Sequence, residues 1–277
     1  MDSSSELTLG SIPYLNCVPF FYHLKKNGFR GKLVTGVPSE LNQMLQRGEL
    51  DASPSSSFEY ARNWRDYFIL PDHSISSVGT VRSVLLFSPV ELAELEGCKV
   101  AMTGESATSI NLLRIIFREF VGLKCVTDWV PDVSIETLIA QGQPALLIGD
   151  RALRLSLQLP EGVKTYDLGE LWFRYTGLPF VFALWMVRRT VLGRFSGEFD
   201  ELGSQLLKSR EQLISDPYPF AAVVAESVKL DVDVIVDYWN TIDFRLEAVH
   251  LQGLQLFFHL CMRYNLLDSE PELIFVK

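Results

Sequence analysis

The stretch LTLGSIPYLNCVPFFYHLKK, residues 7–26, predicts a strand over 7–13 followed at once by a helix that begins at Val18. Pro19 is tolerated there because the first turn of a helix does not use its backbone N–H groups. Asn16 stands between the two elements, and the carboxyl end of a strand in an α/β protein usually faces the ligand. Its amide is therefore a candidate ligand contact, although capping the helix is the better interpretation of this residue taken alone.

Strands and helices alternate along the first half of the chain, and the alternation restarts near residue 98. The first series has strands at 31–36, 50–61 (running into a serine-rich loop) and 80–88, and a helix at 38–49 that Gly48 caps. The second series has strands at 98–103, 124–130, 145–149 and 179–188, and helices at 110–123 and 134–142. Helices alone are expected from about Glu198 onward.

This alternation predicts an α/β fold with mostly parallel sheets. Two series, joined by long strands near 81–88 and 180–188, predict two lobes that the chain crosses twice. We expect lobe 1 to comprise residues 1–87 and 184–277, including the helical C-terminal region, and lobe 2 to comprise residues 88–183. The ligand would lie in the cleft between the lobes, at the carboxyl ends of the strands.

Hydroxyl and amide side chains gather in three loops after predicted strands, at 14–16, 53–57 and 103–109. The third loop, TGESATS, opens onto a helix, whose free N–H groups favour an anion, and its hydroxyls add donors without charge. Helix capping by Ser106 or Thr108 is the simpler explanation of that loop alone. Three such loops in one cleft favour an anion-binding pocket.

Charged residues near these loops allow two interpretations. Asp150 follows a strand and could act as a base or hold a loop, but capping a helix that starts at Arg151 is favoured. Arg82, Arg151 and Arg174 are possible binding groups for a carboxylate, although a lone arginine at a turn is more often solvated.

The composition argues against several classes of protein. The net charge is −9 and no basic run exceeds two residues, so we expect no nucleic-acid partner. No window approaches the ~20 apolar residues of a membrane span, and no secretion signal is visible, which predicts a cytoplasmic protein. Metal-ligand spacings and nucleotide motifs are missing as well, so we expect no metal and no cofactor. The sequence indicates no oligomeric state.

Six segments together resemble a known family, over nearly the whole chain. They are GSIPYLNCVPFF (10–21), DASPSSSFEYA (51–61), VRSVLLFS (81–88), LIGDRAL (147–153), YDLGELW (166–172) and TGLPFVFALW (176–185). In this order they resemble the chorismate dehydratases of the futalosine route to menaquinone. The resemblance implies a two-lobe, type II periplasmic-binding-protein fold. It also implies a cytoplasmic carbon–oxygen lyase, a hydro-lyase that removes water from chorismate to give 3-[(1-carboxyvinyl)oxy]benzoate.

The same resemblance implies which residues act. Asn16 and Ser83 are implied to be catalytic, with the amide of Asn16 holding a dianion without adding negative charge. The residues implied to bind substrate are Tyr14, Ser55, Ser56, Thr103, Ser106, Thr108, Ser109, Gly149 and Asp150. No histidine lies in these motifs, so the substrate's own enolpyruvyl carboxylate is implied as the base.

Two other functions stay open at this point. One is the 1,4-dihydroxy-6-naphthoate synthase of the same pathway, which shares the fold, although the IGDRAL and TGLPF segments are more like the dehydratase. The other is a non-catalytic binding protein for a small carboxylate. The missing signal peptide and the absence of an attached second module argue against a receptor or sensor. Fold alone does not separate these functions.

Overall fold

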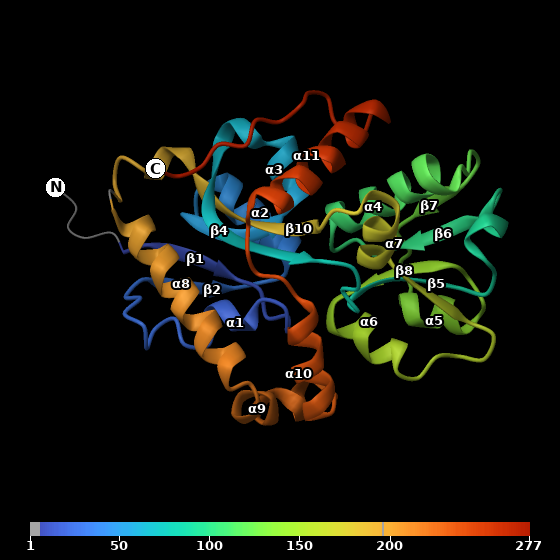
Figure 1. Cartoon of the computed structure of the whole chain (residues 1–277), viewed down its shortest axis with the longest axis horizontal. Coiled ribbons are helices and arrows are strands. Elements are labelled where there is room, and N and C mark those ends of the chain that lie inside the picture. Colours follow the sequence, from blue (N-terminus) through green and yellow to red (C-terminus); the bar gives the residue numbers. More distant parts are fainter. Residues whose placement is uncertain (1–5, 196) are drawn as a thin grey trace.

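The structure is a computed structural model that describes residues 6–195 and 197–277, and it contains two five-stranded sheets (Figure 1). The first has the order β2 (Lys32–Thr35), β1 (Thr8–Ser11), β3 (Ala52–Ser56), β10 (Phe180–Arg188), β4 (Tyr67–Ser77). The second has the order β7 (Thr127–Trp129), β6 (Lys99–Met102), β8 (Ala145–Ile148), β5 (Val84–Ser88), β9 (Lys164–Asp167). In each sheet two of the four strand pairings are parallel and two are antiparallel, because β10 in the first sheet and β5 in the second run opposite to the other four strands. The expectation of mostly parallel sheets therefore holds for half of the pairings in each sheet.

Helices cover both sheets. They are α1 (Val18–Phe21), α2 (Pro38–Arg47), α3 (Ser57–Arg62), α4 (Ala107–Ile115), α5 (Ile135–Ala140), α6 (Gly149–Ser156), α7 (Leu168–Thr176), α8 (Glu198–Ser215), α9 (Tyr218–Val228), α10 (Val232–Thr241) and α11 (Ala248–Arg263). In Figure 1, α8 and α11 lie on opposite sides of the first sheet, and α4, α5, α6 and α7 surround the second. The expected helical C-terminal region is confirmed, and so is the Gly48 cap, which has φ 83°.

Two local expectations are wrong, and one strand was not predicted. The helix after the first strand is regular only over Val18–Phe21, and turns follow it. The strand β3 leads directly into α3, where a serine-rich loop was expected. The helix begins there because the Ser56 hydroxyl accepts a hydrogen bond from Glu59 N and caps it. The strand β4 was not expected, since Pro71, Asp72 and three serines hide its pattern. It forms because β10 pairs with it at both ends and its buried serines bond locally, as Ser74 does to Ser76.

The chain changes sheet in two short segments. β5 pairs with β8 and β9, and β10 pairs with β3 and β4, so the crossings lie at 78–83 and 168–179. Both crossings come a few residues before the expected lobe limits, which fall inside β5 and β10. That each sheet moves with its helices as a separate lobe stays a prediction.

One carboxylate joins the two crossings. Asp167 accepts hydrogen bonds from Val81 N (3.1 Å) and Arg82 N (2.6 Å) in the first crossing, and from Glu170 N (3.1 Å) as the cap of α7 in the second. Arg82 has φ 64°, a conformation that costs energy for a residue with a side chain. The carboxylate therefore fixes the shape of the turn that leads into β5.

The free edge of β4 is covered by two short segments of the C-terminal region. Ser76 N donates to Asp243 O, and Asp243 N donates back to Ser76 O, both at 2.8 Å. At the other end, Ile69 N donates to Ile274 O (2.7 Å) and Val276 N donates to Ile69 O (2.9 Å). The outer strand of the first sheet thus has backbone partners at both of its ends.

The helix α11 packs against the start of β10 through a glycine. A Cβ built on Gly253 would lie 2.1 Å from the carbonyl oxygen of Pro179, which itself accepts a hydrogen bond from Trp172 Nε1. Gly203, in the interior of α8, differs, because a Cβ there would meet His73 Nε2 at an ordinary 3.7 Å. The two helical glycines form a matched pair for testing how closely α11 must approach.

We expect Gly253→Ala to lower the free energy of unfolding by about 1–3 kcal/mol, because the methyl group forces α11 away from Pro179. Gly203→Ala should be neutral or raise it by up to about 1 kcal/mol, because alanine favours a helix interior. Denaturant unfolding followed by circular dichroism measures both. Equal effects of the two substitutions would contradict the close packing at Gly253.

Candidate active site between the two sheets

A cavity of about 80 Å³ lies between the two sheets, lined by residues of both. Eight of the eleven residues predicted to form the site line it: Tyr14, Asn16, Ser55, Ser56, Ser83, Ser106, Ser109 and Gly149. The three polar loops, expected to meet in one cleft, therefore do meet. Thr103, Thr108 and Asp150 are not part of its wall.

Asn16 lies in the turn between β1 and α1, where Cys17 N donates to Tyr14 O at 2.9 Å. Capping, the favoured interpretation of Asn16 alone, is wrong: Cys17 holds the cap position of α1, and no side chain caps that helix. The Oδ1 of Asn16 is buried and has no hydrogen-bond partner among the described residues. A buried acceptor without a partner costs free energy, so a ligand that donates to it would remove that cost.

Ser83 precedes β5 and is held at both its backbone and its side chain. Gly149 N donates to Ser83 O at 2.8 Å, and the Tyr238 hydroxyl donates to Ser83 Oγ at 2.8 Å. Tyr238 comes from α10 and is fully buried, which raises the pKa of its hydroxyl, so it stays a donor. Because Oγ accepts from Tyr238, the hydroxyl proton of Ser83 is left for another acceptor. Tyr238 was missed by sequence analysis, since no motif connects α10 with the cleft.

The 103–109 loop divides into two groups of hydroxyls. Ser106 caps α4 as expected, accepting from Ser109 N at 3.2 Å, and its Oγ lies 3.0 Å from that of Ser109. Thr108 is fully buried, and its Oγ1 accepts from Phe58 N at 2.9 Å, so it joins α4 to α3. Thr103 Oγ1 accepts from Glu105 N and shapes the loop. Of the four residues predicted to bind substrate in this loop, only Ser106 and Ser109 line the cavity.

Asp150, in α6, accepts a hydrogen bond from the turn that follows β1 and so connects this turn to the side of the second sheet. The helix α6 begins at Gly149, not at Arg151, so Asp150 lies inside its first turn and is not its cap. Its Oδ1 accepts from Leu15 N at 3.2 Å, and burial raises the pKa of this carboxyl group. The structure therefore fits the less favoured expectation for Asp150, that its carboxylate holds a loop. Gly149 has φ 68° and faces the ring of Tyr14.

Glu105 is an acidic wall residue that sequence analysis did not single out. It accepts from the Tyr14 hydroxyl (3.3 Å) and from Arg151 Nη1 (3.4 Å). Burial and the nearby Glu105 raise the pKa of Tyr14. Arg151 also binds Glu136, with Nη2 to Oε2 at 2.6 Å, so the expected carboxylate-binding arginine is already paired with the chain's own acids.

The lining residues contain no lysine, arginine or histidine. Besides Glu105 and the Tyr14 hydroxyl that donates to it, the polar groups of the wall are the amide of Asn16, serine hydroxyls, and the first turns of α4 and α6, whose N–H groups favour anions. Within the described residues, no group of three acidic, histidine or cysteine side chains could hold a metal ion. The arrangement is able to bind an anion through neutral donors.

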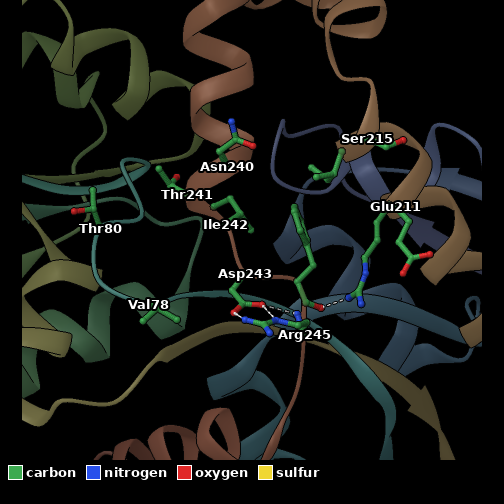
Figure 2. Close-up of a pocket in the computed structure, with 12 residues that line it drawn as sticks. Val78, Thr80, Glu211, Ser215, Asn240, Thr241, Ile242, Asp243 and Arg245 are labelled. Carbon is green, nitrogen blue, oxygen red and sulfur yellow. Dashed lines mark hydrogen bonds and ion pairs between the residues drawn. The ribbon is translucent and has the colours of Figure 1, made fainter.

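A larger cavity, of about 750 Å³, lies outside this site (Figure 2). Its wall comes from the first crossing, from the end of α8, and from α10 with the segment that follows it. None of the residues predicted to form the site lines it.

Solved structures of low sequence identity match nearly all of the chain. The periplasmic aliphatic sulphonate binding protein of Escherichia coli aligns with a TM-score of 0.72 and 16% identity, covering 98% of this chain and 91% of its own. A Candida albicans protein described as having the generic periplasmic binding protein fold aligns with a TM-score of 0.63 and 10% identity, covering 96% and 92%. The expected periplasmic-binding-protein fold is thereby confirmed. No helix of the described residues is long and apolar enough to cross a membrane.

Curated relatives of higher identity carry two descriptions. A chorismate dehydratase of Thermus thermophilus is 38% identical over 196 residues, covering 65% of this chain and 69% of the relative. A chorismate dehydratase of Campylobacter jejuni is 29% identical over 269 residues, covering 94% and 100%. A 1,4-dihydroxy-6-naphthoate synthase of Thermus thermophilus is 26% identical, covering 78% and 74%. A family model described as menaquinone biosynthesis matches residues 7–263, and the chain belongs to that family.

Proposed function

We propose that the protein is a chorismate dehydratase of the futalosine route to menaquinone, a hydro-lyase that converts chorismate to 3-[(1-carboxyvinyl)oxy]benzoate and water. The proposal rests on the family and on one observation, the buried Oδ1 of Asn16 that lacks a partner in a cleft of uncharged donors. Chorismate offers a hydroxyl group and two carboxylates to such a site. The proposal includes a cytoplasmic location, which the free thiols of all four cysteines favour.

The reaction needs charge stabilisation more than strong acids or bases. The proton at C3 leaves, its bonding electrons enter the ring, and the C4–O bond breaks so that the oxygen takes up a proton and departs as water. Negative charge moves onto the ring carboxylate through the C1=C2 bond as the proton leaves. Fixed donors around that carboxylate stabilise the transition state more than the ground state. The formation of an aromatic ring supplies the driving force.

Asn16 and Ser83 are the residues proposed to act on the substrate. Oδ1 of Asn16 can accept from the substrate hydroxyl, or its Nδ2 can donate to a carboxylate, and neither role brings a negative charge near a dianion. The proton of the Ser83 hydroxyl can be donated to an acceptor in the cleft, because in its bond with Tyr238 the Oγ is the acceptor. For the base we propose the enolpyruvyl carboxylate of the substrate, which also carries no new charge into the cleft.

We also propose that the two sheets with their helices form lobes that open. The cavity of about 80 Å³ is far below the roughly 300–1,000 Å³ of small-molecule sites, so entry of chorismate requires it to widen. Contacts such as Leu15 N to Asp150 and Tyr14 to Glu105 hold the two sides together in this structure. The two crossings, 78–83 and 168–179, are the segments about which such a motion would turn.

Purified protein incubated with chorismate and excess EDTA should form a product lighter by one water, over many turnovers. Chromatography with mass detection measures this. Binding without turnover would favour the solute-binding alternative, and no binding would favour the naphthoate synthase. A requirement for added metal would contradict the proposed chemistry.

Replacing Asn16 by Asp should keep the fold and lower kcat by about 10²–10³ or more, since a transition-state donor is lost and a negative charge faces a dianion. The matched control is Asn27→Asp, which makes the same change at a residue whose amide donates to Gln212 and which does not line the cleft. Steady-state kinetics compares the two. Near wild-type turnover by Asn16→Asp would show that Asn16 takes no part in the chemical step.

The ligand-free protein should be less compact than the protein saturated with product. Small-angle scattering should give a larger radius of gyration without ligand, because the cleft must open to exchange its contents. Identical scattering profiles in the two states would argue that the substrate enters by side-chain movement alone.

A further inference from the structure

The larger cavity in Figure 2 has the size and the mixed surface of a small-molecule site. Its volume of about 750 Å³ lies within the roughly 300–1,000 Å³ typical of ligand pockets. Ile214, Ile242 and Phe244 give it an apolar side. Thr80, Asn240 and Thr241, which Figure 2 labels among the lining residues, give it hydrogen-bonding partners.

Arg210 supplies the cavity with a positive charge that lacks an acidic partner. Its Nη1 donates to two backbone carbonyls, Phe244 O at 2.6 Å and Asp72 O at 3.4 Å. Over residues 6–195 and 197–277, no carboxylate makes an ion pair with it. Burial lowers the pKa of Arg210, and the carboxylates of Glu211, Asp243 and Asp72 act on the guanidinium in the opposite sense without pairing with it. An anionic ligand would compensate this charge.

The acids in the wall are already engaged or solvated. Asp243 binds Arg245 through two bonds, Nη2 to Oδ2 at 2.6 Å and Nε to Oδ1 at 2.9 Å, which Figure 2 marks. His250 Nε2 also lies 3.2 Å from Asp243 Oδ2. Glu211 is exposed to solvent, where its charge is screened. The cation of Arg210 beside an apolar wall therefore matches a small carboxylate with an apolar body.

The cavity and the cleft share a wall. Val78 and Thr80 line the cavity, while Val81 and Ser83, farther along the same crossing, line the cleft. On α10, Thr241 lines the cavity, and Tyr238, one turn earlier, donates to Ser83 Oγ. A ligand in the cavity would thus touch both elements that hold Ser83.

We propose that this cavity is a second ligand site for a small carboxylate with an apolar body, and that its occupancy changes the affinity of the cleft for the cleft's own ligand. The coupling would pass through the crossing and α10, which both sites contact. Reciprocity requires that a ligand in the cleft change the affinity of the cavity by the same factor.

Benzoate is the probe, titrated by calorimetry into the wild-type protein and four variants. Arg210→Gln removes the charge, and Ser215→Trp fills the cavity from its exposed rim while keeping Arg210. Lys208→Gln removes an exposed charge from the same helix as a control, and Asn16→Asp alters the cleft. We expect benzoate to bind wild type, Lys208→Gln and Asn16→Asp alike, and to bind Arg210→Gln and Ser215→Trp about tenfold more weakly or worse.

This experiment needs no turnover of chorismate, so its outcome is independent of the proposed function. Binding that is lost in Asn16→Asp but kept in Arg210→Gln and Ser215→Trp would overturn the proposal, because benzoate would then occupy the cleft. No binding to the wild-type protein at millimolar benzoate would overturn it as well. Ser215→Trp keeps the test valid if Arg210→Gln fails to fold.

Coupling is tested separately in the turnover assay. Saturating benzoate should change KM for chorismate roughly fivefold or more in the wild-type protein, and leave it unchanged in Ser215→Trp. A change of equal size in both proteins would mean competition in the cleft and would overturn the coupling. An unchanged KM in both, with benzoate bound to the cavity, would overturn it too.

Discussion

The carboxylate of Asp167 is the constraint on which the arrangement of the cleft depends. It accepts backbone hydrogen bonds from both segments that join the two sheets and thereby sets the left-handed turn at Arg82. Burial raises the pKa of this carboxyl group, and the backbone N–H groups around it oppose that shift. The buried charge is tolerated because so many donors surround it, and Ser83 owes its position beside the cleft to the turn that they form.

The electrostatics of the cleft follow from the absence of lysine, arginine and histidine among the residues that line it. The protein has a net charge of −9, yet the wall of the cleft uses amide and hydroxyl groups where lysine or arginine would be the simplest choice for an anion. A fixed cation would bind the substrate and the transition state about equally, which lowers KM without raising kcat. Arg151 stands near the wall, but Glu105 and Glu136 compensate its charge.

The parts of the fold with a clear local pattern were predictable from the sequence. The restarting alternation gave the order of most elements, and the polar turns after strands identified six of the residues that line the cleft, while the family resemblance supplied Ser83 and Gly149. Long-range contacts decided the rest. The strand β4 exists because of β10, Thr108 turns away from the cleft to bond Phe58, and Tyr238 reaches Ser83 across 155 residues of sequence. No local stretch of sequence indicates these three contacts, because each depends on how two separate elements pack against each other.

The cover on β4 has a consequence for how the protein behaves in a crowded solution. An outer strand with free N–H and C=O groups is a template on which another chain can add a strand, the first step of open-ended aggregation. Here the residues around Asp243 and Ile274 occupy the ends of that edge with hydrogen bonds of their own. These two segments therefore oppose the addition of a further strand at this edge of the first sheet.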